Sequence, residues 1–216
     1  MWPFSTMVRE LAGEPEARSA IDFSAFSDLL TPSHSGVPVT QDSAVNLPSV
    51  YKCVSLNAET ISSLPLDVYA KRGETRVAYP EPPWLRTPNQ YQTMAEFVAM
   101  TQTSLDLDGN AFWLKAPMAN GAIGALYVLA PSAVTVELRE GRIVYWVAQN
   151  GSGPQAYASS EIVHLRGLTL PGTLRGLSPI ACARQTIGIG LAAEQFGAQF
   201  FGNGATLSGS SRRRTR

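Results

Sequence analysis

The stretch from residue 176 to residue 205 constrains the fold of this chain most, because its pattern predicts a long helix with defined ends. Ser178 can cap the start, and Pro179 is tolerated in a first turn. Gly202-Asn-Gly204 is typical of a helix stop. The interior carries an apolar stripe, formed by Ile180, Ile187 and Leu191. It also carries glycines that cost about 1 kcal/mol each in an isolated helix and therefore indicate a close backbone neighbour: Gly188, Gly190 and Gly197.

The same stretch is long enough to raise the question of a membrane span. Its interior contains Arg184 and Glu194, as well as Gln185 and Gln195. One ionised residue at the bilayer centre costs about 2.5–3.5 kcal/mol on insertion scales. We therefore predict a packed helix of a soluble protein with no membrane partner. The chain start, Met1-Trp-Pro-Phe, has no basic region before an apolar run, so we expect no secretory signal.

Composition limits the class of protein further. The 216 residues suffice for one large domain or two small ones. Charged residues make up only 16%, which leaves room for buried contacts between subunits. The 17 basic and 17 acidic residues cancel, which disfavours a general nucleic-acid binder. Cys53 and Cys182 lie in apolar, helix-like contexts, and we expect both to be buried thiols of a reducing compartment.

The remaining elements are short and indicate a mixed α+β fold. Residues 1–42 lack a sustained period, and we expect a mobile arm with a short helix near residues 21–30. A helix capped by Ser43 or Asn46 should run to Pro65. A hairpin follows over residues 66–78, and a second helix should start at the capping box of Thr93 and Glu96 and stop at residues 108–110.

Short antiparallel strands dominate the middle of the chain. They are expected at residues 111–115, 125–129, 133–137, 143–147 and 161–165. Asn120-Gly121 and Glu140-Gly141 are tight-turn signals between them. Residues 149–155 are polar and rich in glycine, so we predict a loop there. We predict no catalytic, cofactor-binding or metal-binding residues.

Candidate chemistry is sparse. His34 falls in the expected arm, and His164 falls in a strand pattern, where a structural hydrogen bond is favoured over a catalytic base. No nucleophile-elbow, zinc-protease or phosphate-loop motif occurs. Residues 106–110 superficially resemble a calcium loop, but Lys115 stands where the bidentate glutamate is needed. A hydrolase with a site around His164 and Glu161 is the third and least favoured hypothesis, because no nucleophile and base are suitably spaced.

Several fragments together resemble a known family. In chain order they are Ala44-Val-Asn-Leu-Pro-Ser-Val-Tyr-Lys-Cys-Val54, Ala58-Glu-Thr-Ile-Ser-Ser-Leu-Pro-Leu66, Leu85-Arg-Thr-Pro-Asn89, Thr93-Met-Ala-Glu-Phe97, Asp108-Gly-Asn-Ala111, Leu126-Tyr-Val-Leu-Ala-Pro131, Ile162-Val-His-Leu165, Gly176-Leu-Ser-Pro-Ile180 and Phe200-Phe-Gly-Asn-Gly-Ala205. Each is weak alone, but their order over residues 43–209 is specific. The chain resembles the amino-terminal, wing part of HK97-like tailed-bacteriophage portal proteins.

The resemblance implies a wing-type α+β domain over residues 43–209, with short antiparallel strands, flanking helices and a long helix rich in small residues at its C-terminal end. It also implies a ring of identical subunits, typically a dodecamer, at one capsid vertex of the virion, assembled in the host cytoplasm. Double-stranded DNA passes through such a ring during packaging and ejection. Implied partners are the major capsid protein, the terminase and the head–tail adaptor, and no catalytic site is implied.

The sequence departs from the family after residue 209. Family members continue into stem, clip and crown elements, whereas this sequence ends in a basic tail, residues 210–216, which we expect to be disordered. We therefore expect a structural portal subunit or a truncated fragment of one. The alternative is a stand-alone wing-fold binding or adaptor module whose basic tail contacts nucleic acid.

Overall fold

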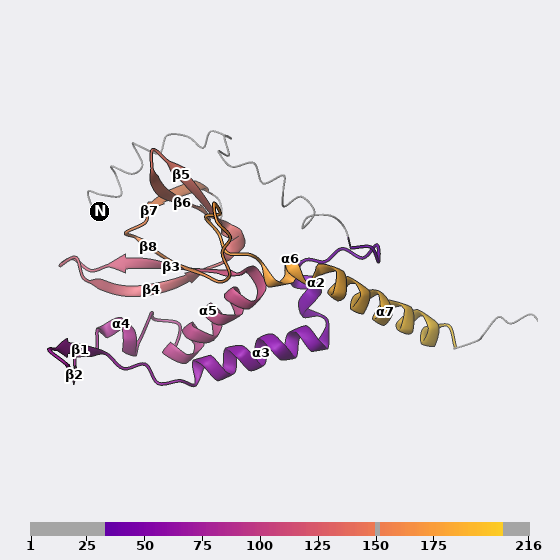
Figure 1. Ribbon diagram of the computed structural model, residues 1–216, viewed down its shortest axis with the longest axis horizontal. Coiled ribbons are helices and arrows are strands. Elements are labelled where there is room, and N and C mark those ends of the chain that lie inside the picture. The colour runs from indigo at the N-terminus through magenta and orange to yellow at the C-terminus, as the bar shows by residue number, and fades with distance from the viewer. Residues whose placement is uncertain (1–32, 150–151, 205–216) are drawn as a thin grey trace, which may run out of the picture.

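The computed structural model describes residues 33–149 and 152–204, and these form the predicted α+β architecture (Figure 1). The helices are α2 (Gln41–Val45), α3 (Pro48–Ser62), α4 (Pro83–Arg86), α5 (Met94–Asp108), the 3-10 turn η2 (Pro131–Ala133), α6 (Pro179–Cys182) and α7 (Arg184–Gly202). The strands are β1 (Tyr69–Arg72), β2 (Thr75–Ala78), β3 (Asn110–Pro117), β4 (Ile123–Leu129), β5 (Val134–Arg139), β6 (Arg142–Gln149), β7 (Ser152–Ala158) and β8 (Ile162–Arg166).

Helix α5 begins and ends where local chemistry predicts. The Thr93 side chain accepts a hydrogen bond from the Glu96 N–H, and the Glu96 carboxylate accepts one from the Thr93 N–H at 2.7 Å. This capping box satisfies amides that the first turn leaves free. Gly109 ends the helix in the left-handed conformation at φ 79°. The buried face of α5 presents Phe97 to Trp113 on β3, with ring centroids 5.0 Å apart.

The start of the domain differs from the expected single helix. Thr40 caps a separate short helix, α2, through a reciprocal capping box with Ser43. Helix α3 then begins at Pro48, and its N-cap residue, Leu47, makes no side-chain hydrogen bond. Ser43 therefore supports the cap of α2 instead of starting α3. Structured chain begins before residue 43, and residues 1–32 of the expected arm lie outside the described part.

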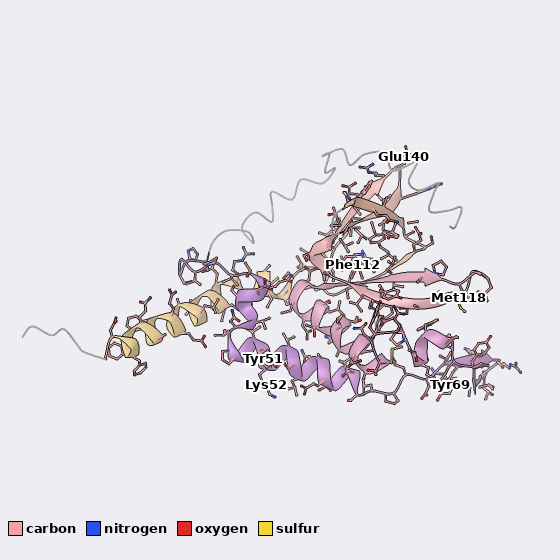
Figure 2. The ribbon with its side chains drawn as sticks, turned by 180° about the vertical axis from the view of Figure 1, so that it is seen from behind. Tyr51, Lys52, Tyr69, Phe112, Met118 and Glu140 are labelled. Atoms are coloured by element: carbon pink, nitrogen blue, oxygen red, sulfur yellow. The ribbon has the colours of Figure 1, made fainter. Side chains whose placement is uncertain are left out.

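Two antiparallel three-stranded sheets enclose the main core. Their strand orders are β4-β3-β8 and β5-β6-β7. The core cluster takes residues from both sheets, namely Phe112, Val134, Tyr145, Val147 and Ile162. Figure 2 shows Phe112 between the sheets, while Met118 and Glu140 mark the ends of the β3–β4 and β5–β6 hairpins. Gly121 and Gly141 adopt positive φ in those turns, as the turn signals predict.

Strand β7 replaces most of the loop predicted over residues 149–155. It pairs with β6 from Val144↔Ala158 to Gln149↔Ser152. Gly153 and Pro154 are poor strand formers, which explains why the sequence pattern favours a loop. Both residues are tolerated because β7 is an edge strand of its sheet. A proline there, which lacks an N–H, does not interrupt hydrogen bonding between two central strands.

The β1–β2 hairpin forms within the predicted residues 66–78, and its residues are almost all exposed. It lies at the end of the molecule opposite α7 (Figure 1). Lys71 and Arg76 stand directly opposite each other across the ladder. Like charges in such a position are destabilising, so the hairpin is not optimised for stability by itself.

The C-terminal helix is broken once, between α6 and α7, at Ala183 with φ −90° and ψ 9°. Ser178 caps α6 and Pro179 opens it, as predicted. Ile180 and Ile187 are buried with Ala44. Both cysteines are exposed, which corrects the expectation of buried thiols. The physical reason is that Cys53 and Cys182 lie on helix faces turned away from the core.

Close approach explains two of the three helix glycines. A Cβ on Gly188 would lie 2.5 Å from Ser33 Oγ, and one on Gly190 would lie 3.0 Å from Leu47 Cδ2. Gly197 has open space around it. The close neighbours are side chains of Ser33, Ser35 and Leu47, whereas the sequence predicts an approaching backbone. Among the described residues, no helix is long and apolar enough to cross a membrane.

Candidate functional site

A cluster of polar residues joins the sheets to the C-terminal helices. We call it the polar junction and define it as Asp108, Asn110, His164, Arg175 and Gly176. These residues come from the end of α5, the start of β3, strand β8 and the loop before α6. In Figure 1 the chain passes from the sheets to the projecting helix α7 through this region. The junction therefore sets how α7 leaves the rest of the domain.

Arg175 connects three parts of the chain. Its Nη1 donates to the Val134 carbonyl oxygen at 2.6 Å, and its Nη2 donates to Asp108 Oδ1 at 2.7 Å. The guanidinium lies 5.4 Å from the centre of the Phe112 ring. The side chains of Arg175 and Asp108 are 31% and 15% exposed, so water screens this ion pair only in part. The loop before α6 is thereby fixed to the end of α5 and the start of β5.

The Asn110 side chain acts like a peptide group toward Gly176. Its Oδ1 accepts from the Gly176 N–H at 2.7 Å, and its Nδ2 donates to the Gly176 carbonyl oxygen at 3.0 Å. Nδ2 also donates to Asp108 Oδ1 at 2.8 Å. Asn110 is 1% exposed, so these bonds satisfy amide atoms that burial would otherwise penalise.

Glycines allow the backbones to touch inside the junction. The Gly109 carbonyl oxygen accepts from the Gly167 N–H at 2.9 Å. A Cβ on Gly109 would clash with the Leu177 carbonyl oxygen, and one on Gly176 would clash with the Gly109 carbonyl oxygen. Only glycine therefore fits at positions 109 and 176 without moving the neighbouring backbone.

His164 is held as a neutral structural residue. Its Nε2 lies 3.1 Å from Asn110 Oδ1, which can only accept, so Nε2 carries the proton. Its Nδ1 faces the Tyr145 hydroxyl at 3.5 Å, and its ring stacks on Phe112 at 4.2 Å. Burial, followed by the charges of Arg166 and Arg175, lowers the pKa of His164 to about 4, while the charge of Asp108 opposes the shift. The structure confirms the predicted hydrogen-bonding role.

The other residues considered for chemistry have structural partners of their own. Glu161 Oε2 accepts from the Ala158 N–H at 2.9 Å and closes the turn between β7 and β8. Residues 106–110 form the end of α5 and the following turn. The His34 N–H donates to Gln185 Oε1 at 2.9 Å, against α7. Within residues 33–149 and 152–204, no three His, Cys, Asp or Glu side chains could together hold a metal ion.

Exposed apolar side chains gather on two surfaces. One set is spread over α3, the segment that follows it and the β1–β2 hairpin; Figure 2 labels Tyr51 on α3 and Tyr69 on β1. It consists of Tyr51, Leu56, Ile61, Leu64, Leu66, Tyr69, Val77 and Tyr79, and we call it the α3 band. The other is a row on one side of α7, which we call the α7 stripe: Ile189, Ala193 and Phe196 are exposed and Phe200 is half-buried. Exposed large apolar side chains gathered along a segment are candidates for an interaction site.

The sequence did not predict the junction as a unit. The helix stop that the sequence predicts at residues 108–110 is confirmed, and residues 172–176 form the loop before α6. What the sequence lacks is any signal that Arg175 pairs with Asp108, because 67 residues separate them. Correlated changes in related sequences are the kind of signal that could have revealed the pair.

Comparison with protein families gives one matching description. The model of the family "Phage portal protein" matches residues 48–213. The probable portal protein of Streptomyces phage phiC31 is 34% identical over 183 residues, covering 79% of this chain and 40% of that protein. The portal protein of Enterobacteria phage HK97 is 33% identical over 173 residues, covering 77% of this chain and 40% of that protein. The chain thus spans about two fifths of the length of these curated relatives.

Solved structures share the fold. A chain of the native gene transfer agent virion has a TM-score of 0.65 at 18% identity, covering 95% of this chain and 52% of that chain. A chain in the neck of the native gene transfer agent particle, computed with C12 symmetry, has a TM-score of 0.58 at 16% identity, covering 98% of this chain and 55% of that chain. At these identities the likeness concerns the fold alone.

Proposed function

The chain belongs to the phage portal protein family, and from this premise we propose that it is a structural subunit of a portal ring at one vertex of the capsid. The observation that carries the proposal is the family match over residues 48–213. The resulting ring would be the conduit for double-stranded DNA during packaging and ejection, and the platform on which head and tail join. The chain would act in the virion after assembly in the host cytoplasm.

Self-association is the central part of the proposal. The related neck structure was computed with C12 symmetry, which supports a ring of identical subunits for this chain as well. The α3 band supplies apolar surface that a neighbouring subunit could bury. The remaining proposed partners are the major capsid protein, the terminase and the head–tail adaptor.

A structural role without catalysis fits the polar junction. The polar-junction side chains best suited to catalysis are His164 and Arg175, and both hold loops and strands together. His164 is neutral at physiological pH, and its Nδ1 faces the Tyr145 hydroxyl instead of an open surface. We therefore propose that the chain acts by assembly and not as an enzyme.

The test is the oligomeric state of the purified chain, measured by light scattering after size-exclusion chromatography and by negative-stain microscopy. We expect closed rings. Leu56→Asp in the α3 band places a charge in the proposed contact and should yield folded monomers. Tyr91→Asp is the matched control, because Tyr91 is 75% exposed and lies outside the band. Monomeric wild-type chain with native circular dichroism would refute self-assembly for this polypeptide.

The alternative of a stand-alone module that binds nucleic acid through its basic tail stays a prediction, because residues 210–216 lie outside the described part. It is tested by DNA binding at several salt concentrations, with and without residues 211–216. Equal affinity of the two forms would exclude a role for the tail.

A further inference from the structure

The β1–β2 hairpin is an incomplete sheet at the surface of the domain (Figure 1). Its strands form a sheet of their own, and among the described helices and strands each has more than marginal contact only with the other. Apart from Ala70, every residue of β1 and β2 is exposed. A hairpin without packing support is marginally stable in water, and a third strand is one of the additions that stabilise it.

The register shows which backbone groups of the hairpin point outward. The Tyr79 N–H donates to the Val68 carbonyl oxygen at 2.9 Å, so these residues form a hydrogen-bonded pair. Because bonded and non-bonded pairs alternate along an antiparallel ladder, Lys71 and Arg76 form a non-bonded pair. Ala78 belongs to another such pair. Arg76 and Ala78 therefore direct their N–H and C=O groups to the outer edge of β2, where the described chain supplies no partner strand.

Unpaired positive charge lies beside this edge. Lys71 and Arg76 project from the same side of the hairpin, and the Cα atoms of a non-bonded pair are only about 4.5 Å apart. Within the described ranges, the ion pairs are those of Arg86, Arg139 and Arg175, so Lys71 and Arg76 have none. Like charges directly opposite each other are destabilising, and a neighbouring carboxylate would relieve the repulsion.

One kind of ligand would supply both the missing strand and the missing negative charge. An extended peptide can pair its backbone with an exposed sheet edge. Side chains alternate between the two sides of a strand, so carboxylates at every second position would all lie on the side of Lys71 and Arg76. The residues between them would lie on the side of Val77, which is 43% exposed and offers apolar contact.

We propose that the outer edge of β2 binds an extended acidic segment of another protein as an antiparallel third strand. A nucleic acid fits less well, because its phosphates only accept hydrogen bonds and cannot donate to the outward C=O groups of Arg76 and Ala78. The balanced charge of the whole chain also disfavours a polyanion. The site does not rest on the proposed ring, whose contact uses apolar side chains instead of a strand edge.

Fluorescence anisotropy with short labelled peptides and the full chain tests the proposal. A peptide of alternating Glu and Val with blocked ends should bind at least about tenfold more tightly than one of alternating Lys and Val. In the proposed pairing the Glu amides face β2 and the Val amides face away. Methylation of the Glu amide nitrogens should therefore abolish binding, whereas methylation of the Val amide nitrogens should preserve it.

Variants of the chain locate the binding site. Arg76→Glu should reverse the preference, so that the Lys–Val peptide becomes the tighter ligand. Arg142→Glu is the matched control, because Arg142 is an exposed arginine of the β5–β6 hairpin, and both affinities should stay unchanged. Ala78→Pro removes an outward N–H without changing the charge and should weaken binding of the Glu–Val peptide at least about tenfold.

Four results would overturn the proposal. Equal binding of the two methylated peptides would show that backbone pairing is not used. A single-stranded oligonucleotide of equal charge that binds as tightly as the Glu–Val peptide would assign the edge to nucleic acid. Binding seen only in the Leu56→Asp variant would mean that a neighbouring subunit of the ring already occupies the edge. No binding of the Glu–Val peptide at millimolar concentration would show that the edge does not accept a strand.

Discussion

Alanine at position 109 should destabilise the domain far more than alanine at a glycine of similar backbone conformation elsewhere. Gly109 has φ 79°, and a left-handed conformation costs an alanine about 1–2 kcal/mol. The added Cβ would also clash with the Leu177 carbonyl oxygen. Moving that backbone strains the hydrogen bond from the Gly167 N–H to the Gly109 carbonyl oxygen. Overpacking of this kind costs about 1–3 kcal/mol, so we expect a total loss of about 3–4 kcal/mol.

Gly141→Ala is the matched control. Gly141 has φ 75°, but nothing lies within 4 Å of its Cβ position, so only the conformational cost of about 1–2 kcal/mol applies. Urea unfolding followed by circular dichroism gives the unfolding free energy of each variant from its midpoint and slope. The reasoning requires Gly109→Ala to lose about 2 kcal/mol more than Gly141→Ala. Equal losses would mean that the backbones at the polar junction separate at little cost.

Three further outcomes follow from the junction and the helix cap. Arg175→Met should lower the unfolding free energy by about 1.5–3 kcal/mol, because it removes charge-assisted hydrogen bonds to Val134 and Asp108. A double-mutant cycle with Asp108→Asn should show coupling between the Arg175 and Asp108 side chains. The pKa of His164 is lowered from 6.5 to about 4 in the folded state, so on acidification the unfolded state binds a proton before the folded state does. The unfolding free energy should therefore fall as the pH drops from 6.5 to about 4. His164→Gln should reduce this pH dependence, measured by urea unfolding at several pH values. Ser178→Ala should cost about 1–2 kcal/mol in thermal or urea unfolding, since the hydroxyl both caps α6 and donates to the Leu107 carbonyl oxygen at 2.8 Å.

Elements set by neighbouring residues could be predicted from the sequence. The capping box of Thr93 and Glu96 and the stop at Gly109 bound α5 because their hydrogen bonds and backbone preferences are local. The turn at Glu140-Gly141 is equally local. The glycines at 188 and 190 also predicted a close neighbour, although not that residues 33–47 would be that neighbour.

Features that depend on distant partners could not be predicted. Strand β7 forms because β6 offers a free edge, which its own glycine and proline do not indicate. Cys53 and Cys182 lie in apolar sequence, but which side of each helix meets the core is decided by packing. The same limit applies to the polar junction, where Arg175 meets residues far back in the chain.

The order β4-β3-β8 has a consequence during synthesis of the chain. Strand β3 can pair with β4 once both have left the ribosome, but its other edge has no partner until residues 162–166 follow. At about 5–20 residues per second, translating the intervening β5–β7 sheet takes several seconds. For that time β3 presents an open edge able to pair with another chain. Slow codons or stalled translation between β4 and β8 would therefore raise aggregation, whereas a pause after β8 would not.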